Sequence, residues 1–251
     1  MQANTPHVKI ERAGAVLCVD FDRPEKKNAL SSAMYLAATG ALQAAETDCS
    51  IGAVAFAGTA GAFTAGNDLG DFLDADGGHG DLPAFTFIKA LARCETPLVA
   101  AIEGVAIGIG ATMMLHCDLV YVAPGTVFRL PFVDLGLVPE AASSLLLPRR
   151  IGMAKAAEFL LLGESFGAED AVRLGLANSI VPAPELRKFA LEKAGRLAAK
   201  PRAALAATRR LMRGDSHGIL ARIEEEARLF SVALRSSEAQ TALAAFLAKR
   251  R

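Results

Sequence analysis

The stretch PLVAAIEGVAIGIGATMML, residues 97–115, decides how the chain is read. Its apolar run from Leu98 to Ile102 predicts a buried strand. The glycine-rich segment 104–110 then predicts a tight turn, because glycine lets the backbone bend freely and lets another segment come close. Residues 111–115 predict the start of a helix. A strand, a glycine turn and a helix N-terminus together can bind negative charge, since the first helical amides lack internal partners.

This turn does not match the nucleotide-binding motifs. A dinucleotide fingerprint needs Gly-x-Gly-x-x-Gly, and here Met113 occupies the third glycine position after Gly108 and Gly110. The segment also lacks the Lys-Ser/Thr ending of a phosphate-binding loop. A structural tight turn explains the glycines equally well, so this stretch alone indicates no function.

Composition excludes several classes of protein. The 251 residues suffice for one large domain, or a domain with a small appendage. Lys plus Arg equals Asp plus Glu at 27 each, so no net charge favours nucleic acid or a membrane surface. With 52% hydrophobic residues and a mean hydropathy of +0.32, the chain is apolar enough to suggest burial between subunits. No apolar run reaches the ~18 residues of a membrane span.

The same survey predicts where the protein is found and which ligands it lacks. The N-terminus, MQANTPHVKIER, has no signal-peptide core, so we expect a cytoplasmic protein. Four scattered cysteines without a CxxC pair predict reduced, buried thiols. No spaced set of His, Cys and Asp predicts a metal site.

Periodicity and turn residues predict strands in the first two thirds and helices at the end. The run Glu224–Glu226 with Arg228 reads as a solvated helix face. Residues 71–81 predict a loop, in which His79 is expected to be exposed. The change of pattern suggests a core over 1–195 and a helical subdomain over 196–251. Strands are expected at 8–10, 15–21, 51–57, 118–122, 127–130 and 178–181, and helices after the cap Ser31 to 46, at 83–95, 153–162 and 168–174, and from 185 with breaks at Pro201 and 214–218.

Two strand-to-turn units carry a family resemblance: AFTAGNDL (62–69), here called the first turn, and EGVAIGIGA (103–111), the second turn. Together with PFVDLGLVPE (131–140) they resemble the crotonase family, the enoyl-CoA hydratases and isomerases. The resemblance covers essentially the whole chain. It implies an α/β spiral of ββα units with a helical C-terminal region for trimerisation, as a homotrimer or a dimer of trimers. It also implies an acyl-CoA thioester substrate, with CoA as part of that substrate and no separate cofactor.

The resemblance also implies roles for particular residues. By position in the motifs, the amides of Asn67 and Ile109 match the family's two oxyanion-hole donors. Such donors stabilise the negative charge on a thioester oxygen, and losing one typically costs about 3–4 kcal/mol. The residues expected to line the CoA pocket are Ala65, Gly66, Asn67, Asp68, Leu69 and Ile109, with Lys27 and Ala29 from the loop at 26–30 near the nucleotide end.

The acid and base groups depart from the hydratase pattern. Hydratases of this family use two glutamates around a water, and the corresponding positions here are Thr112 and Phe132. Glu140 remains, and its placement resembles the peroxisomal-type Δ3,Δ2-enoyl-CoA isomerases, in which a single glutamate moves the proton. We expect apolar neighbours such as Leu137 and Val138 to disfavour its ionisation.

Alternatives remain open at this point. The position of Glu140 is also typical of a carboxylate at the start of a helix, where it interacts favourably with the helix dipole. Two other interpretations are a hydratase that uses Glu140 with a differently placed water, and a non-catalytic acyl-CoA-binding homologue. Asp68 and Asp134 are expected to fix loops through backbone amides. The residues His116, Met113 and Met114 are expected to pack in the core.

Overall fold

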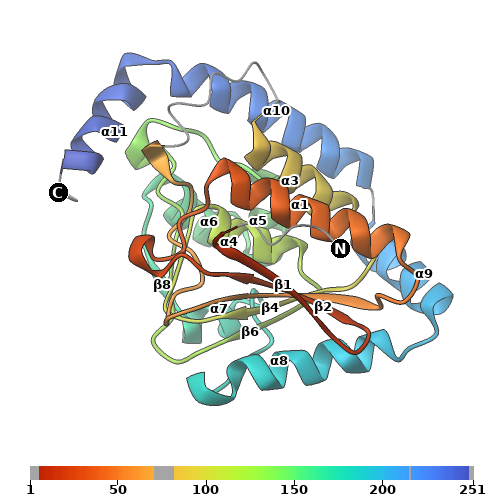
Figure 1. Cartoon of the computed structure of the whole chain (residues 1–251). Coiled ribbons are helices and arrows are strands. Elements are labelled where there is room, and N and C mark those ends of the chain that lie inside the picture. Colours follow the sequence, from red (N-terminus) through yellow and green to blue (C-terminus); the bar gives the residue numbers. More distant parts are fainter. Residues whose placement is uncertain (1–5, 71–81, 215, 249–251) are drawn as a thin grey trace.

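The main sheet (Figure 1) has central strands that are buried on both faces. The computed structural model describes residues 6–70, 82–214 and 216–248. Within these ranges the sheet is parallel except at one edge, where the first strand pairs antiparallel with the second. In spatial order the strands are β1 (Val8–Ala13), β2 (Val16–Phe21), β3 (Ala53–Gly58), β4 (Leu98–Ile102), β6 (Leu119–Val122) and β9 (Ser179–Ile180).

A second, three-stranded sheet continues the same chain segments. β4 is followed by β5 (Val105–Ile107) and β6 by β7 (Val127–Arg129), and these two strands pair in parallel. β8 (Phe166–Gly167) pairs antiparallel with β7. After β3, Thr64 forms a bridge to Ala106 in β5. Successive segments therefore contribute to both sheets, which confirms the predicted crotonase-like spiral.

Helices cover the two faces of the main sheet, as parallel strands require (Figure 1). Neighbouring residues of a strand point to opposite faces. In β3, Val54 belongs to the core shared with α1 (Ser32–Thr47) and α3 (Pro83–Arg93). The next residue, Ala55, belongs to the core shared with α8 (Ala183–Ala198). Alternate residues of one apolar strand thus contribute to two hydrophobic cores.

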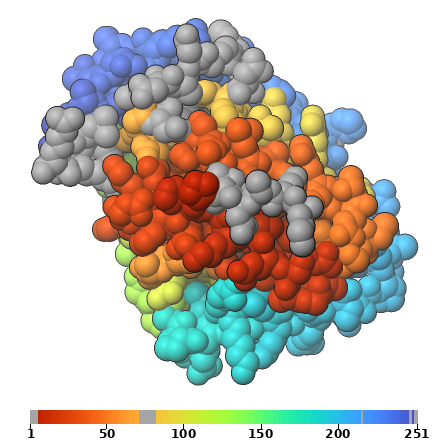
Figure 2. All heavy atoms as spheres, viewed as in Figure 1, coloured from red at the N-terminus to blue at the C-terminus, as the bar shows by residue number. Residues whose placement is uncertain are grey.

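The remaining helices follow the expected order, with ends that differ by a few residues. The helix expected from 111 begins at Ile109, and position 195 lies inside α8. Figure 2 shows the C-terminal helices in blue at one end of this face and α8 in cyan at the other. The further elements are η1 (Pro24–Lys26), α4 (Ile109–Thr112), η2 (Met113–His116), η3 (Val133–Leu135), α5 (Ser143–Ile151), α6 (Met153–Leu161), α7 (Ala168–Arg173), α9 (Arg202–Arg213), α10 (Ser216–Leu234) and α11 (Ser237–Ala248).

Two further predictions concern membrane-spanning helices and the loop at 71–81. Among the described helices, none is both long and apolar enough to cross a membrane. The loop expected at 71–81, with His79, lies outside the described residues.

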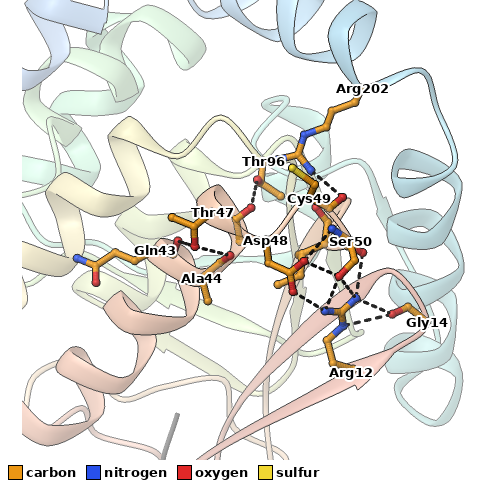
Figure 3. A network of polar contacts seen from close by, with 12 residues as sticks. Arg12, Gly14, Gln43, Ala44, Thr47, Asp48, Cys49, Ser50, Thr96 and Arg202 are labelled. Carbon is orange, nitrogen blue, oxygen red and sulfur yellow. Dashed lines mark hydrogen bonds and ion pairs between the residues drawn. The ribbon is translucent and has the colours of Figure 1, made fainter. Parts of the chain in front are cut away.

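Arg12 joins the first hairpin to the connection between α1 and β3 (Figure 3). Its guanidinium donates to the Ser50 carbonyl oxygen at 2.9 Å and pairs with Asp48 at 3.1 Å. At the same corner Arg202 of α9 donates to the Cys49 carbonyl oxygen at 3.2 Å. Cys49 is exposed because it lies in this surface connection, so the prediction of a buried thiol is wrong at this position. The other three cysteines are buried and free, as predicted.

Glycine is required where the chain after β3 meets the chain after β4. Gly104 has φ +70°, and a Cβ built there would lie 1.9 Å from the carbonyl oxygen of Gly61. Next to this contact, the Phe63 amide donates to the Glu103 carbonyl oxygen at 2.8 Å. The two backbones therefore touch without an intervening side chain, which brings the first and second turns together.

Replacing Gly104 by alanine should lower the free energy of unfolding by about 2–5 kcal/mol, because the new Cβ would overlap a backbone carbonyl. Gly125 is a matched control, since its φ is +73° and a Cβ there would meet nothing within 4 Å. The Gly125→Ala change should cost only about 1–2 kcal/mol of conformational energy. Urea denaturation followed by circular dichroism measures both. Equal losses in the two variants would contradict the close approach.

Candidate active site

The first and second turns lie side by side through backbone hydrogen bonds. The Thr64 amide donates to the Val105 carbonyl oxygen, and the Ile107 amide donates to the Thr64 carbonyl oxygen, both at 3.0 Å. A Cβ on Gly66 would lie 2.9 Å from the Ile107 carbonyl oxygen. The two segments predicted to carry the oxyanion-hole amides are thus in direct contact, although they are about forty residues apart in sequence.

Asn67 comes just after this contact in the first turn, and Ile109 comes just after it in the second turn. Ile109 begins α4 after Gly108, whose φ of 55° and ψ of −117° suit only glycine. The Asn67 side chain accepts a hydrogen bond from the Tyr35 hydroxyl, which ties the first turn to α1. Within residues 6–70, 82–214 and 216–248, neither the Asn67 amide nor the Ile109 amide donates a hydrogen bond to another group of the protein. Neither amide is therefore occupied by an acceptor from the described chain, as an oxyanion-hole donor requires.

The loop that contains Lys27 and Ala29 is joined to the first turn. The Ala65 amide donates to the Lys27 carbonyl oxygen at 2.9 Å, and the Leu30 amide donates to the Gly66 carbonyl oxygen at 2.8 Å. Lys27 is exposed and Ala29 is buried. The structure thus brings together the residues predicted to surround CoA.

A partly buried ion pair strengthens the same junction. The Asp68 carboxylate pairs with the Arg23 guanidinium at 2.6 Å, and Arg23 also donates to the Ala29 carbonyl oxygen at 3.1 Å. Asp68 further accepts from the Gly70 amide at 3.2 Å, which is the loop-fixing contact expected for it. The loop-fixing contacts of Tyr35 and Arg23 were not predicted from the sequence, because no local pattern distinguishes a tyrosine or arginine that fixes a loop. Asp134, which was expected to bond backbone amides, instead pairs with Arg129 at 2.9 Å.

Glu140 is buried against α4, with only 1% of its surface exposed. Its carboxylate accepts a hydrogen bond from the Thr112 hydroxyl at 3.0 Å. Thr112 lies one helical turn after Ile109, so the carboxyl lies against the same short helix whose first amide is the predicted oxyanion donor. Thr112 itself occupies the position where hydratases carry a glutamate. The second such position, Phe132, is buried and apolar.

Burial changes the acidity of Glu140. Loss of hydration raises the pKa of Glu140 from 4.5 to about 8. The hydrogen bond from Thr112 opposes this rise, and the negative charge of Glu226 adds to it. The rise expected from apolar neighbours is therefore present.

The backbone that follows Glu140 is strained. Ala141 has φ 59° and Ala142 has φ 54°, a left-handed conformation that typically costs a residue with a Cβ about 1–3 kcal/mol. His116 donates through Nε2 to the Ala141 carbonyl oxygen at 2.8 Å, and Ser143 donates through Oγ to the Glu140 carbonyl oxygen at 2.6 Å. His116 is packed in the core, as expected, and burial lowers its pKa to about 4. It therefore bonds as the neutral imidazole.

Glu226 corrects one sequence prediction. It was expected on a solvated face, but only 4% of its surface is exposed. Its carboxylate accepts from the Ala142 amide at 2.6 Å and from the Ser144 amide at 3.1 Å. A helical period could have revealed this burial, since Ile223 and Ala227 place Glu226 on the apolar face of α10. Glu226 is thus the carboxylate at the start of α5, and Glu140 is not.

The remaining candidates are structural. Met113 and Met114 are fully buried, as predicted. Over the described parts of the chain, no group of His, Cys, Asp and Glu could hold a metal ion. The candidate site consists of two backbone amides, one buried carboxyl with its hydroxyl partner, and the loop joined to the first turn.

Comparison with known proteins places this arrangement in a family. The family model described as enoyl-CoA hydratase/isomerase matches residues 11–251. A probable enoyl-CoA hydratase of Rhodobacter capsulatus is 34% identical over 97% of this chain and 95% of its own length. Enoyl-CoA delta isomerase 2 of Rattus norvegicus is 36% identical over 70% of this chain and 46% of its own length.

Solved structures agree with these relatives. The crystal structure of an enoyl-CoA hydratase/isomerase from Pseudoalteromonas atlantica T6c superposes with a TM-score of 0.92 at 38% identity and covers 98% of both chains. This agreement extends over both sheets and the C-terminal helices, so it concerns the whole fold and not only the glycine turns. The chain is an enzyme of the enoyl-CoA hydratase/isomerase family, the crotonase family that its paired glycine turns resemble.

Proposed function

We propose that this enzyme isomerises a 3-enoyl-CoA to a 2-enoyl-CoA, with Glu140 as the group that moves the proton. The observation that carries the proposal is the buried Glu140 carboxyl, bonded by Thr112 one helical turn from the amide of Ile109. This chemistry needs a single base, because one carboxyl can remove a proton from C2 and return it to C4.

The other buried carboxylates of the described chain have structural partners. Glu226 accepts from the amides of Ala142 and Ser144. Asp20, in β2, pairs with Arg187 at 2.6 Å. A water held between two glutamates would need carboxyls at 112 and 132, where the chain has a hydroxyl and a phenyl ring. This difference favours isomerisation over hydration.

In the proposed mechanism, Glu140 takes a proton from C2 and the thioester oxygen becomes negative. The amides of Asn67 and Ile109 would donate to this oxygen, and each such donor typically contributes about 3–4 kcal/mol to the transition state. The same carboxyl then protonates C4. A well-placed general acid–base group contributes about 10²–10⁴-fold in rate. The raised pKa suits this role, since a proton shuttle works best when its pKa is near the working pH.

We assign the CoA part of the substrate to the loop and first turn. Ala65–Leu69 and Ile109 would line the pocket, with Lys27 and Ala29 toward the nucleotide. The backbone bonds that join Lys27 to Ala65 support this placement. We also propose a homotrimer or a dimer of trimers. The support is the strong exposure of two neighbouring apolar residues of α9, Leu211 at 85% and Met212 at 82%.

An enoyl-CoA hydratase is the second candidate, because the relatives that align over nearly their full length include proteins named as hydratases. One is the Rhodobacter capsulatus protein, and another is the 2,3-dehydroadipyl-CoA hydratase of Escherichia coli, which is 32% identical over 96% of this chain. In that case Glu140 would activate a water held elsewhere.

Substrate choice separates the two candidates. The purified enzyme should convert 3-hexenoyl-CoA to the conjugated 2-enoyl-CoA, which is detected by the ultraviolet absorbance of the enoyl thioester. With crotonyl-CoA it should form little of the 3-hydroxy product, as measured by liquid chromatography. Hydration of crotonyl-CoA without isomerisation of 3-hexenoyl-CoA would overturn the proposal.

The Glu140→Gln variant should lose at least about 10²-fold in kcat, because the amide cannot exchange a proton, while its shape and volume are retained. Asp134→Asn is the matched control, since this carboxylate belongs to the same segment but is partly exposed and pairs with Arg129. The control should keep nearly the full rate in the isomerase assay. An unchanged rate in Glu140→Gln would instead favour a non-catalytic role for this residue.

The raised pKa of Glu140 should also appear in stability and rate. The folded state keeps its proton up to about pH 8, whereas the unfolded state loses it near 4.5. Burial of this group therefore lowers the free energy of unfolding as pH rises through that window, by up to about 1.4 kcal/mol per pH unit. Glu140→Gln should remove the Glu140 part of this dependence, as measured by urea denaturation between pH 4.5 and 8, while Glu226, whose pKa burial raises to about 7, keeps its own part. The kcat/KM of the unmodified enzyme should rise toward pH 8, because the base must be ionised. Parallel stability curves for the two proteins would contradict the shift.

A further inference from the structure

The helix that follows Glu140 is capped by a side chain from the C-terminal region. Helix α5 begins after Ala142, which has no side chain able to cap it. Glu226, 84 residues further along the chain, accepts from the Ala142 amide at 2.6 Å. It also accepts from the amide and the hydroxyl of Ser144, at 3.1 Å and 2.5 Å. A carboxylate from α10 thus satisfies amides at the start of α5 that would otherwise lack partners.

We propose that Glu226 is a positioning residue for the reaction, which clamps the backbone after Glu140 and so holds the Glu140 carboxyl against Thr112. The proposal rests on the catalytic role proposed for Glu140. Ala141 and Ala142 adopt left-handed conformations that alanine does not favour. Without the clamp this pair can relax toward right-handed conformations, and such a relaxation would turn the adjoining Glu140.

The charge of Glu226 has a second effect. It raises the pKa of Glu140, because a nearby negative carboxylate disfavours ionisation of a second one. Burial raises the pKa of Glu226 itself to about 7, so Glu226 is mostly ionised before Glu140 titrates near 8. His116 adds no charge at neutral pH, since burial lowers its pKa to about 4. The titratable and polar groups around the pair are Thr112 from α4, His116 from η2, Ser144 from α5 and Arg222 from α10, with Arg150 and Arg213 beside His116.

Two substitutions separate the clamp from the charge. Glu226→Gln keeps the shape but removes the charge and one acceptor, so kcat should fall about 10- to 100-fold through misplacement of the base, with KM changed less than about threefold. Its acidic limb in kcat/KM should move to lower pH by about half a unit or more. Glu226→Asp keeps the charge but is shorter, so kcat should fall while the acidic limb stays near its original pH.

Glu224→Gln is the matched control, because Glu224 lies on the same helix, is exposed and pairs with Lys89. This variant should match the unmodified enzyme in rate and pH profile. Ser144→Ala removes one donor to Glu226 and retains the amide, so it should lower kcat a few-fold with the fold intact by circular dichroism. It provides the test if Glu226→Gln does not fold. A folded Glu226→Gln or Ser144→Ala with unchanged kcat and pH profile overturns the proposal.

A measurement without turnover distinguishes this proposal from the proposed function. The pKa of Glu140 can be followed by the 13C shift of its labelled carboxyl, which is assigned by its absence in Glu140→Gln. Glu226→Gln should lower this pKa even if 3-hexenoyl-CoA proves not to be a substrate. If the unmodified enzyme isomerises 3-hexenoyl-CoA but neither kcat nor the Glu140 pKa responds to Glu226→Gln, the proposed function stands and the positioning role fails.

Discussion

Backbone hydrogen bonds between Thr64 and the strand Val105–Ile107 join the two glycine turns, and the rest of the structure depends on this contact. The two segments approach so closely that a Cβ added at Gly104 would overlap the carbonyl oxygen of Gly61. Because the contact is made by backbone atoms, the direction of the nearby amides follows from the pairing of the sheet. The candidate oxyanion hole is therefore a consequence of the spiral itself and does not depend on which side chains follow the glycines.

A buried carboxyl places a second constraint on the fold. Removing Glu140 from water makes it a stronger base, but burial of an ionised group is costly without polar partners. Here the hydroxyl of Thr112 supplies a hydrogen bond at one of the two positions where hydratases of the family carry a glutamate. Threonine at position 112 thus removes one carboxylate that could hold a water, and it gives the Glu140 carboxyl a neutral hydrogen-bond donor. Both effects follow from one residue of α4.

The C-terminal helices are connected to this site by more than packing. Helix α10 contributes Glu226, whose carboxylate satisfies the first amides of α5 and stabilises the strained pair after Glu140. The strain and the cap lie within two residues of the proposed base. Strained backbone at such a place is typical of functional sites, where the surrounding structure must over-determine the conformation. The helical region and the ββα core therefore form one unit around Glu140.

Much of this could be predicted from short segments. The apolar run of β4, the glycine turn after it and the Ser31 cap of α1 each depend on residues within a few positions, so the sequence by itself determined these elements and the family. Only the tertiary structure decided which distant groups meet. The helical period of α10 indicates that Glu226 is buried, but only the fold shows that its carboxylate meets the Ala142 amide. The physical reason is that burial and charge depend on every segment that packs around a residue, and no local pattern records segments 84 positions away.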